Sequence, residues 1–145
     1  METKLPSYWA TPFTKICLGM KIGVETMFYL LDKEASSLFS LIQDGKYRPT
    51  NLGLDEWKKL IGSQASLQKN CKKEGFNVLS DNPNSSKARI GIVGNNEDDC
   101  STSDSRIGFG TGGYPEHTST CGNVAKHGGD SGDELVEAMG YIFVQ

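Results

Sequence analysis

The chain has 145 residues, a formal net charge of −3 and a sequence pI near 5.4. This length suits one domain with a single core. The slightly acidic balance argues against nucleic-acid binding, which needs a clustered basic face. No stretch approaches the roughly 20 consecutive apolar residues of a membrane-spanning helix. The 17 glycines, with many Ser, Asn and Asp residues, indicate a loop-rich domain in which short strands outnumber long helices.

The N-terminal region carries no secretion signal, because no apolar h-region follows residues 1–6. We therefore expect a chain made without a leader or one that has lost it, with residues 1–7 as a flexible segment. Residues 13–31 are rich in β-branched and aromatic side chains and are punctuated by Gly19 and Gly23. This composition predicts a strand hairpin.

Two short amphipathic helices are predicted after the hairpin. In residues 35–43 the apolar positions fall on one helical face, and Gly45 stands where a C-terminal cap is expected. In residues 54–61 apolar side chains repeat at helical spacing around Trp57. Acidic residues in the first turn and lysines in the last suit the helix dipole.

The sequence becomes strand-like again after Cys71. GFNVL and ARIGIVG read as strands separated by the turn-forming run 80–86. The acidic residues 95–105 and the glycine stretch that follows are expected to form a long loop region, either functional or disordered, and a disulfide from Cys100 or Cys121 would favour the ordered alternative. Apolar residues alternate through residues 135–145 and predict one terminal strand.

The run GFGTGG, residues 108–113, matches the dinucleotide-binding pattern G-x-G-x-x-G. No helical apolar period follows it, so no helix N-terminus is available to a phosphate. The glycines instead indicate a backbone that needs positive φ, or one that approaches another group closely. Both alternatives stay open at this stage.

Four cysteines occur at wide, irregular spacing: Cys17, Cys71, Cys100 and Cys121. The absence of a C-x-x-C pair disfavours zinc and favours disulfides, which implies an oxidising compartment. The spacing does not choose among the three connectivities, and four buried thiols in a cytosolic protein are the alternative. The sequon Asn84-Ser85-Ser86 agrees with secretion.

Catalytic chemistry has little support in the sequence. His117 and His127 are the two histidines, and neither lies in a nucleophile elbow or a cysteine-protease signature. A glycosidase needs two carboxylates at a fixed separation, which the sequence cannot pair. The sequence gives more support to metal binding. Asp, Glu and Asn residues are frequent in the glycine-rich residues 95–133, and their oxygen atoms suit calcium. A solvated acidic loop is the alternative, since the spacing is not that of an EF-hand.

The sequence CSTSDSRIGFGTGGYPEHTSTCGN, followed by a polar glycine-rich stretch and DELVEAMGYIFVQ, resembles the C-terminal part of intelectins (X-type lectins), in the fibrinogen-related group. Upstream, KNCKKEGFNV and SKARIGI resemble the family's approach to its acidic loop, so the likeness covers residues 69–145. Residues 8–31 match loosely and are more similar to extracellular modules of invertebrate matrix proteins. The resemblance implies one shortened fibrinogen-related, intelectin-like domain over residues 1–145. Its fold would be α+β, with a mixed sheet, two short helices, long ordered loops and disulfides.

The resemblance also implies a calcium site whose open side binds the vicinal hydroxyls of a sugar. Asp104 and Glu116 would be both metal ligands and acceptors for sugar hydroxyls, and His127 supplies the nearby ring. By the same analogy the disulfides are Cys71–Cys100 and Cys17–Cys121. The implied metal ligands are Asp104, Glu116, Asn123, Ser101 and Ser103.

The expected function is therefore a secreted, extracellular, calcium-dependent lectin without enzymatic activity. Its partners would be glycans or glycoproteins, with no nucleic acid and no membrane span. Homo-oligomerisation is a route to useful avidity. Two alternatives remain: a structural or adhesive extracellular-matrix module on the same fold, and a glycoside hydrolase that uses the acidic loop.

Overall fold

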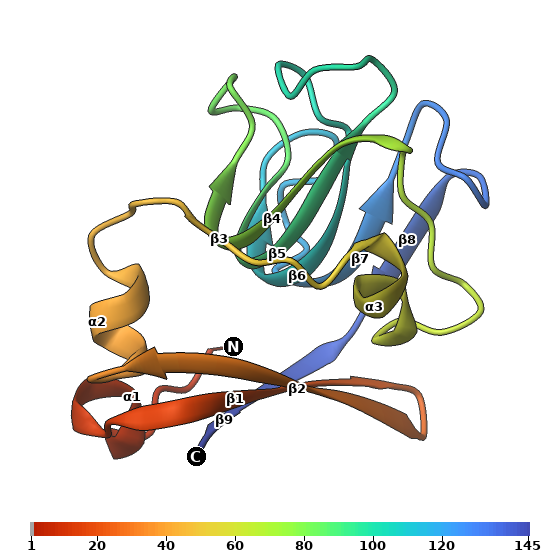
Figure 1. Cartoon of the computed structure of the whole chain (residues 1–145). Helices are drawn as coiled ribbons and strands as arrows, with labels where there is room; N and C mark the ends of the chain where they lie inside the picture. The colour runs from red at the N-terminus through yellow and green to blue at the C-terminus, as the bar shows by residue number, and fades with distance from the viewer. Residues whose placement is uncertain (1) are drawn as a thin grey trace.

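The structure is a computed structural model that describes residues 2–145, and within them the chain forms three helices and nine strands. The strands make two antiparallel sheets, seen as two layers in Figure 1. Sheet A has the order β2-β1-β9, and sheet B the order β3-β4-β5-β6-β7-β8. The helices are α1 (Pro6–Ala10), α2 (Leu38–Ile42) and α3 (Leu54–Lys59). The strands are β1 (Phe13–Ile22), β2 (Glu25–Ala35), β3 (Arg48–Pro49), β4 (Asn70–Leu79), β5 (Lys87–Asn95), β6 (Ser105–Gly112), β7 (Cys121–Ala125), β8 (Glu134–Glu137) and β9 (Met139–Val144).

The α+β composition is confirmed, with every strand pair antiparallel. The predicted hairpin is β1–β2, and the two predicted helices are α2 and α3. The structure adds α1, a third helix, which begins inside the predicted N-terminal segment at Pro6. A proline in the first helical turn is favourable because its missing N–H has no intrahelical partner there.

Two predictions about strands need correction. The glycine stretch is not a loop: residues 105–112 form β6, paired with β5 and β7. The terminal segment is not one strand, because β8 belongs to sheet B and β9 to sheet A. The chain changes sheets at Ala138, whose N–H donates to the Cys121 carbonyl. Alternation of apolar residues continues through this change, so the pattern alone could not locate it.

The hydrophobic core lies between the two sheets. Sheet A contributes the inward side chains of β1, and sheet B those of β4, β5 and β6. The helices close the layer with further apolar residues, so the burial of apolar surface joins both sheets in one core. Central members of this cluster are Ile16, Leu18, Met20, Leu38, Leu41, Trp57, Leu60, Phe76, Ile90, Ile92, Ile107 and Phe109.

A buried carboxylate ties α3 to sheet B. Glu74 on β4 is 7% exposed, and its side chain accepts hydrogen bonds from Thr50 Oγ1 (2.7 Å), Gly53 N (2.8 Å), Trp57 Nε1 (2.6 Å) and Leu52 N (3.2 Å). Four donors satisfy a charge that would otherwise be costly to bury. The contact also supplies the acceptor that the start of α3 lacks locally, since its N-cap residue is a glycine.

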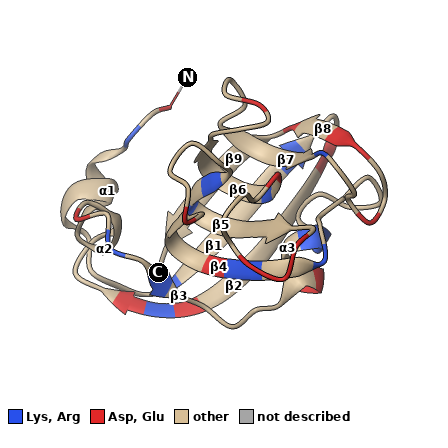
Figure 2. Cartoon of the chain, turned by 90° about the horizontal axis from the view of Figure 1, so that it is seen from above, with Lys and Arg blue, Asp and Glu red and all other residues tan. Residues whose placement is uncertain are grey.

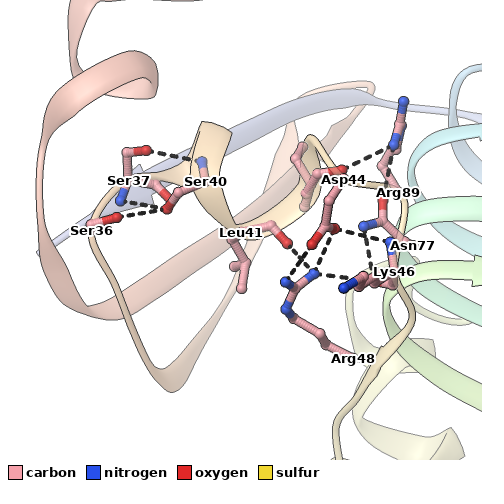
Figure 3. A network of polar contacts seen from close by, with 10 residues as sticks. Ser36, Ser37, Ser40, Leu41, Asp44, Lys46, Arg48, Asn77 and Arg89 are labelled. Atoms are coloured by element: carbon pink, nitrogen blue, oxygen red, sulfur yellow. Dashed lines mark hydrogen bonds and ion pairs between the residues drawn. The ribbon is translucent and has the colours of Figure 1, made fainter.

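A polar network fastens the chain where it crosses from sheet A to sheet B (Figure 3). Asp44 and Arg48 form a two-pronged ion pair at 2.9 and 2.8 Å, and Arg48 also donates to the Leu41 carbonyl at the end of α2. The Arg48 guanidinium holds the pKa of Asp44 well below its usual range. On the sheet B side, Arg89 donates to Asn77 Oδ1 (2.9 Å), while Asn77 donates to the Lys46 carbonyl (3.1 Å). The crossing segment is therefore held from both sheets.

Four glycines stand opposite one another across sheet B. Gly75 pairs with Gly91, Gly91 with Gly108, and Gly108 with Gly122. A Cβ on Gly108 would lie 2.4 Å from the Ile90 carbonyl oxygen, and one on Gly122 would lie 2.0 Å from that of Val136. The close-approach explanation is thus the correct one at Gly108, whereas the positive-φ explanation is correct at Gly110 (58°) and Gly113 (84°). The row lets the backbones of neighbouring strands in sheet B come close together.

The disulfide Cys71–Cys100 is confirmed, with the two Cα atoms 5.0 Å apart. Cys71 sits at an irregularity in β4 and has a positive φ of 66°, which turns it toward the loop that carries Cys100. The second predicted pair, Cys17–Cys121, is wrong, and both thiols are free. Cys121 packs against the core between the sheets, whereas Cys17 points to the outer side of sheet A, opposite to Ile16 and Leu18. Sheet A itself separates the two thiols.

Gly108→Ala is expected to lower the free energy of unfolding by about 1–3 kcal/mol or more, because a new Cβ must displace the backbone of β5. Chemical denaturation measures this change. Gly112→Ala on the same strand is the matched control, since its nearest neighbour would be the flexible Lys87 side chain at 3.5 Å. Equal stabilities for the two variants would contradict the assigned close approach.

Cys71→Ser is expected to lower the unfolding free energy by about 3–4 kcal/mol in the chain-entropy view of a cross-link over 29 residues. Cys17→Ser serves as the control and should change stability little, because its thiol is unpaired and partly exposed. Thermal melts with and without a reductant give the comparison. A wild-type melting temperature that ignores the reductant would argue against the disulfide.

Candidate functional site

Three loops cover the face of sheet B that points away from the core: residues 80–86, 99–104 and 113–120, called the cap loops below. They bond to one another through the backbone, with Asp81 N to Cys100 O at 2.8 Å and Tyr114 N to Asn84 O at 2.7 Å. The first two rise above sheet B in Figure 1. The disulfide ends in the second cap loop at Cys100. The cap loops are therefore ordered by their own contacts.

A buried arginine holds the third cap loop in place. Arg106 on β6 is 0% exposed, and its guanidinium donates to the carbonyls of Gly113 (3.0 Å), Glu116 and Ser119 (3.5 Å). Burial lowers the pKa of Arg106 to about 10, and the nearby Glu116 charge opposes this shift. The planar fork of an arginine suits several carbonyl acceptors at once. These bonds fix the loop on either side of its turn.

The ordered cap loop presents Tyr114 to His127. The Tyr114 hydroxyl and His127 Nε2 are hydrogen-bonded at 2.9 Å. The two rings are nearly parallel, at 3°, with centroids 6.2 Å apart. Tyr114 is 44% exposed, and His127 is also exposed. The pair forms a ring surface that solvent reaches.

Asp104 lies beside this pair. It directly precedes β6, and its carbonyl accepts from Lys126 N, next to His127. Burial raises the pKa of Asp104, and the positive form of His127 opposes that shift. Asp104 is therefore close to His127, and His127 is in turn hydrogen-bonded to Tyr114. We call Asp104, His127 and Tyr114 the candidate site.

Gln68 joins the two sides of the candidate site. Its Nε2 donates to the His127 carbonyl (3.0 Å), and its Oε1 accepts from Asp104 N (3.2 Å). Gln68 is 0% exposed, so these bonds are sheltered from water. His127 has a positive φ of 54°, which is uncommon for a residue other than glycine and is held here by its surroundings.

Asn123, one of the expected calcium ligands, has another use. It is 0% exposed; its Oδ1 accepts from Ser66 N (2.8 Å), and its Nδ2 donates to the carbonyls of Ser66 (2.8 Å) and Arg106 (3.0 Å). The amide therefore fastens the segment around Ser66 to sheet B. It points to the core side of the sheet, where Val136 and Ile107 are its cross-strand neighbours.

The other expected ligands are likewise engaged locally. Glu116 accepts from the backbone N (2.7 Å) and hydroxyl (2.5 Å) of Thr118, and these bonds lower the pKa of Glu116. Ser101 donates to Asp99, and Ser103 is buried with its hydroxyl toward the disulfide sulfur of Cys71. The structure brings Asp104 and His127 together but does not gather the five expected ligands around one point.

A metal centre is not evident from the arrangement of charges. Within residues 2–145, no three His, Cys, Asp or Glu side chains meet in a way that could hold an ion. Calcium prefers six to eight oxygen ligands, and the amide of Asn123 faces the core side of sheet B while Glu116 lies in the cap. The residues that the resemblance implies as ligands are thus engaged in separate hydrogen bonds, and calcium binding stays a prediction of the resemblance.

The surface charge gives no sign of a nucleic-acid site. Figure 2 shows Lys and Arg interspersed with Asp and Glu rather than gathered on one face. No helix in the described chain has both the length and the apolar character needed to cross a membrane. Comparison with family models, curated proteins and solved structures finds no match for this chain.

Sequence reasoning missed two members of this region. Tyr114 lies only ten residues after Asp104, but nothing in the sequence shows that its loop folds back toward His127. The one feature of the sequence that indicates a turn at Tyr114 is its position directly after a glycine pair and before Pro115. Gln68 carried no signal, because a glutamine in a loop is usually solvated.

Asp104→Asn is expected to leave the melting temperature at neutral pH unchanged or raised, because it removes a carboxylate whose charged form burial disfavours. The pKa of Asp104 is higher in the folded state than its ordinary 3.8, so its ionisation costs stability above the folded-state pKa. The advantage of the variant should therefore shrink as the pH falls through that pKa toward 3.8. Thermal melts across this range test the sign.

The opposite result would be informative. A variant that is markedly less stable at neutral pH, with the deficit vanishing in acid, would mean that the Asp104 charge stabilises the fold. Asp104 would then be a structural residue rather than a group held for a ligand.

Proposed function

We propose that the protein is an extracellular carbohydrate-binding module without enzymatic activity, and that the sugar binds at Asp104, His127 and Tyr114. The observation that carries the proposal is the hydrogen-bonded, parallel pair of Tyr114 and His127 beside the half-buried Asp104. An exposed aromatic ring bonded to an imidazole, with a carboxylate close to that imidazole, suits a sugar, since a pyranose has an apolar face and a rim of hydroxyl donors.

The chemistry of recognition is direct contact. A carboxylate accepts strong hydrogen bonds from neutral hydroxyls, and the negative face of the Tyr114 ring attracts the polarised C–H groups of a sugar. His127 offers a ring nitrogen that donates or accepts according to its tautomer. Gln68 and the cap loops hold the site before a ligand arrives, which lowers the entropy cost of binding.

The resemblance to intelectins supports the same class of ligand, because it led to Asp104 and His127 as sugar-binding residues. Our proposal differs in mechanism, since it assigns no step to calcium. The fibrinogen-related fold that the resemblance implies is likewise a proposal, and so is secretion. The disulfide Cys71–Cys100 agrees with an oxidising compartment.

A second candidate function has its own observation. The outer face of sheet A is apolar and exposed, and such surfaces mark interaction sites. It favours the alternative of a structural or adhesive extracellular-matrix module that holds other molecules through this face. The two candidates use opposite sides of the molecule, so separate variants distinguish them.

Binding to a glycan array tests the first candidate. Tyr114→Ala is expected to weaken binding at least about tenfold, or ~1.4 kcal/mol, because the ring surface is lost. Tyr114→Phe keeps the ring and should weaken binding less. Asp104→Asn should also weaken binding while the fold stays intact by circular dichroism.

Two controls separate direct contact from calcium coordination. Glu116→Gln and addition of a chelator should both leave binding unchanged, because neither Glu116 nor a metal takes part. Loss of binding in both would restore the calcium mechanism. A wild-type protein that binds no glycan would refute the carbohydrate proposal and favour the adhesive module.

A further inference from the structure

The outer face of sheet A carries a continuous apolar surface. Its outward residues come from β2, β1 and β9, and they are largely aromatic or aliphatic in the two central rows. Four of them are more than half exposed: Phe28 (56%), Leu30 (51%), Met139 (61%) and Phe143 (53%). No other element of the described chain covers this face, which is the lower side of Figure 1. We call it the outer face.

The side chains of the outer face are organised rather than scattered. Phe28 leans across the central strand over Gly19, where a Cβ would lie 2.5 Å from its ring. Its ring centroid is 6.4 Å from that of Phe143, which stacks in turn on Tyr141 at 6.2 Å and 4°. Three rings from the two edge strands thus meet over the middle strand, and they form one apolar surface.

We propose that the outer face binds a second copy of this chain, face to face, with the two β1 strands crossing near Cys17. β1 is the middle strand of sheet A, so a two-fold axis parallel to the two stacked sheets can place the strand over its own copy. On this strand Cys17 has a short side chain and Gly19 has none, and they are flanked by the bulky Phe28, Leu30, Tyr141 and Phe143. The rings of Phe28, Tyr141 and Phe143 fill the space over this strand, so two copies of the face can pack ring against ring when sheets stack about 10 Å apart.

The charges at the ends of the outer face favour self-association over an unrelated partner. Lys21 lies at one end, and Lys15 and Asp32 lie at the other. When the two copies stack with antiparallel strands, the end with Lys21 meets the end with Asp32. Asp32 remains available to pair with Lys21 of the second copy, because its side chain is 87% exposed and its ion pair with Lys15 is long, at 3.8 Å.

The size of the outer face predicts a weak dimer. Aromatic side chains present about 150–250 Å² each when fully exposed, so these half-exposed residues offer on the order of 500 Å² per copy. Two copies then bury about 1,000 Å², which is the lower limit of a specific interface. Dimerisation should therefore depend on concentration. Two candidate sugar sites in one dimer would raise avidity without a new contact.

Sedimentation velocity from low micromolar to near-millimolar concentration is the direct test. The wild type should shift from monomer to dimer over this range, and Phe143→Asp should raise the dimer dissociation constant at least about tenfold, because it places a charge in an apolar contact. Val24→Asp is the matched control: Val24 is 96% exposed in the turn between β1 and β2, so its change should have no effect. A wild type that stays monomeric throughout overturns the proposal.

Cross-linking of the wild type with a short bismaleimide tests the arrangement with the outer face unaltered. Wild type and Cys121→Ser should give a covalent dimer, and Cys17→Ser should not. Cys121 is a built-in contrast, since burial raises the pKa of its thiol to about 12 and keeps it unreactive. A dimer that fails to cross-link at Cys17 contradicts the crossing of the two β1 strands. Neither experiment involves sugar binding, so its outcome is independent of the proposed carbohydrate site.

Discussion

The buried guanidinium of Arg106 is the interaction on which the candidate site depends. It joins β6 to three carbonyls of residues 113–120 and thereby holds a loop that has no regular structure of its own. A charge with no water around it is stable only while these acceptors stay in place, so the loop and the arginine keep each other ordered. Tyr114 lies between two of the bonded carbonyls. Its position beside His127 is therefore a consequence of a contact made inside the cap.

Sheet B has an apolar side, which faces the core, and a polar side, which the cap loops cover. On the core side, apolar residues of β4, β5 and β6 pack against sheet A, with Glu74 and Asn123 as satisfied polar exceptions that tie loops to the sheet. On the other side, the cap loops bury serines and Arg106. Loops rather than helices cover this face, and loops positioned by a rigid sheet are common places for binding residues. The candidate site lies at the rim of this cap.

The local patterns of the sequence predicted more of the fold than of the site. Apolar periodicity located α2 and α3, because each buries one face, and the strand-favouring composition of residues 13–31 located the first hairpin. GFGTGG was misjudged because its glycines suggested a loop, although Ile107, Phe109 and Thr111 alternate with them as in a strand. Cys17 and Cys121 could not be excluded as a pair without knowing that they lie on opposite sides of sheet A. Asn123, which the resemblance implies as a ligand, instead forms structural hydrogen bonds with Ser66. The sequence could not show this contact, because Ser66 is far away in the chain.

A sugar bound at the candidate site would contact His127 and Tyr114, and the chain contains an internal reference for testing this contact. His117 is the other of its two histidines and lies in the turn of the third cap loop, outside the candidate site. Imidazole resonances in a proton–carbon NMR spectrum should therefore respond differently when a binding glycan is titrated in. We predict that the signals of His127 and the Tyr114 ring shift with the glycan concentration while those of His117 stay in place. A glycan that binds but leaves the His127 signal unmoved would contradict the account.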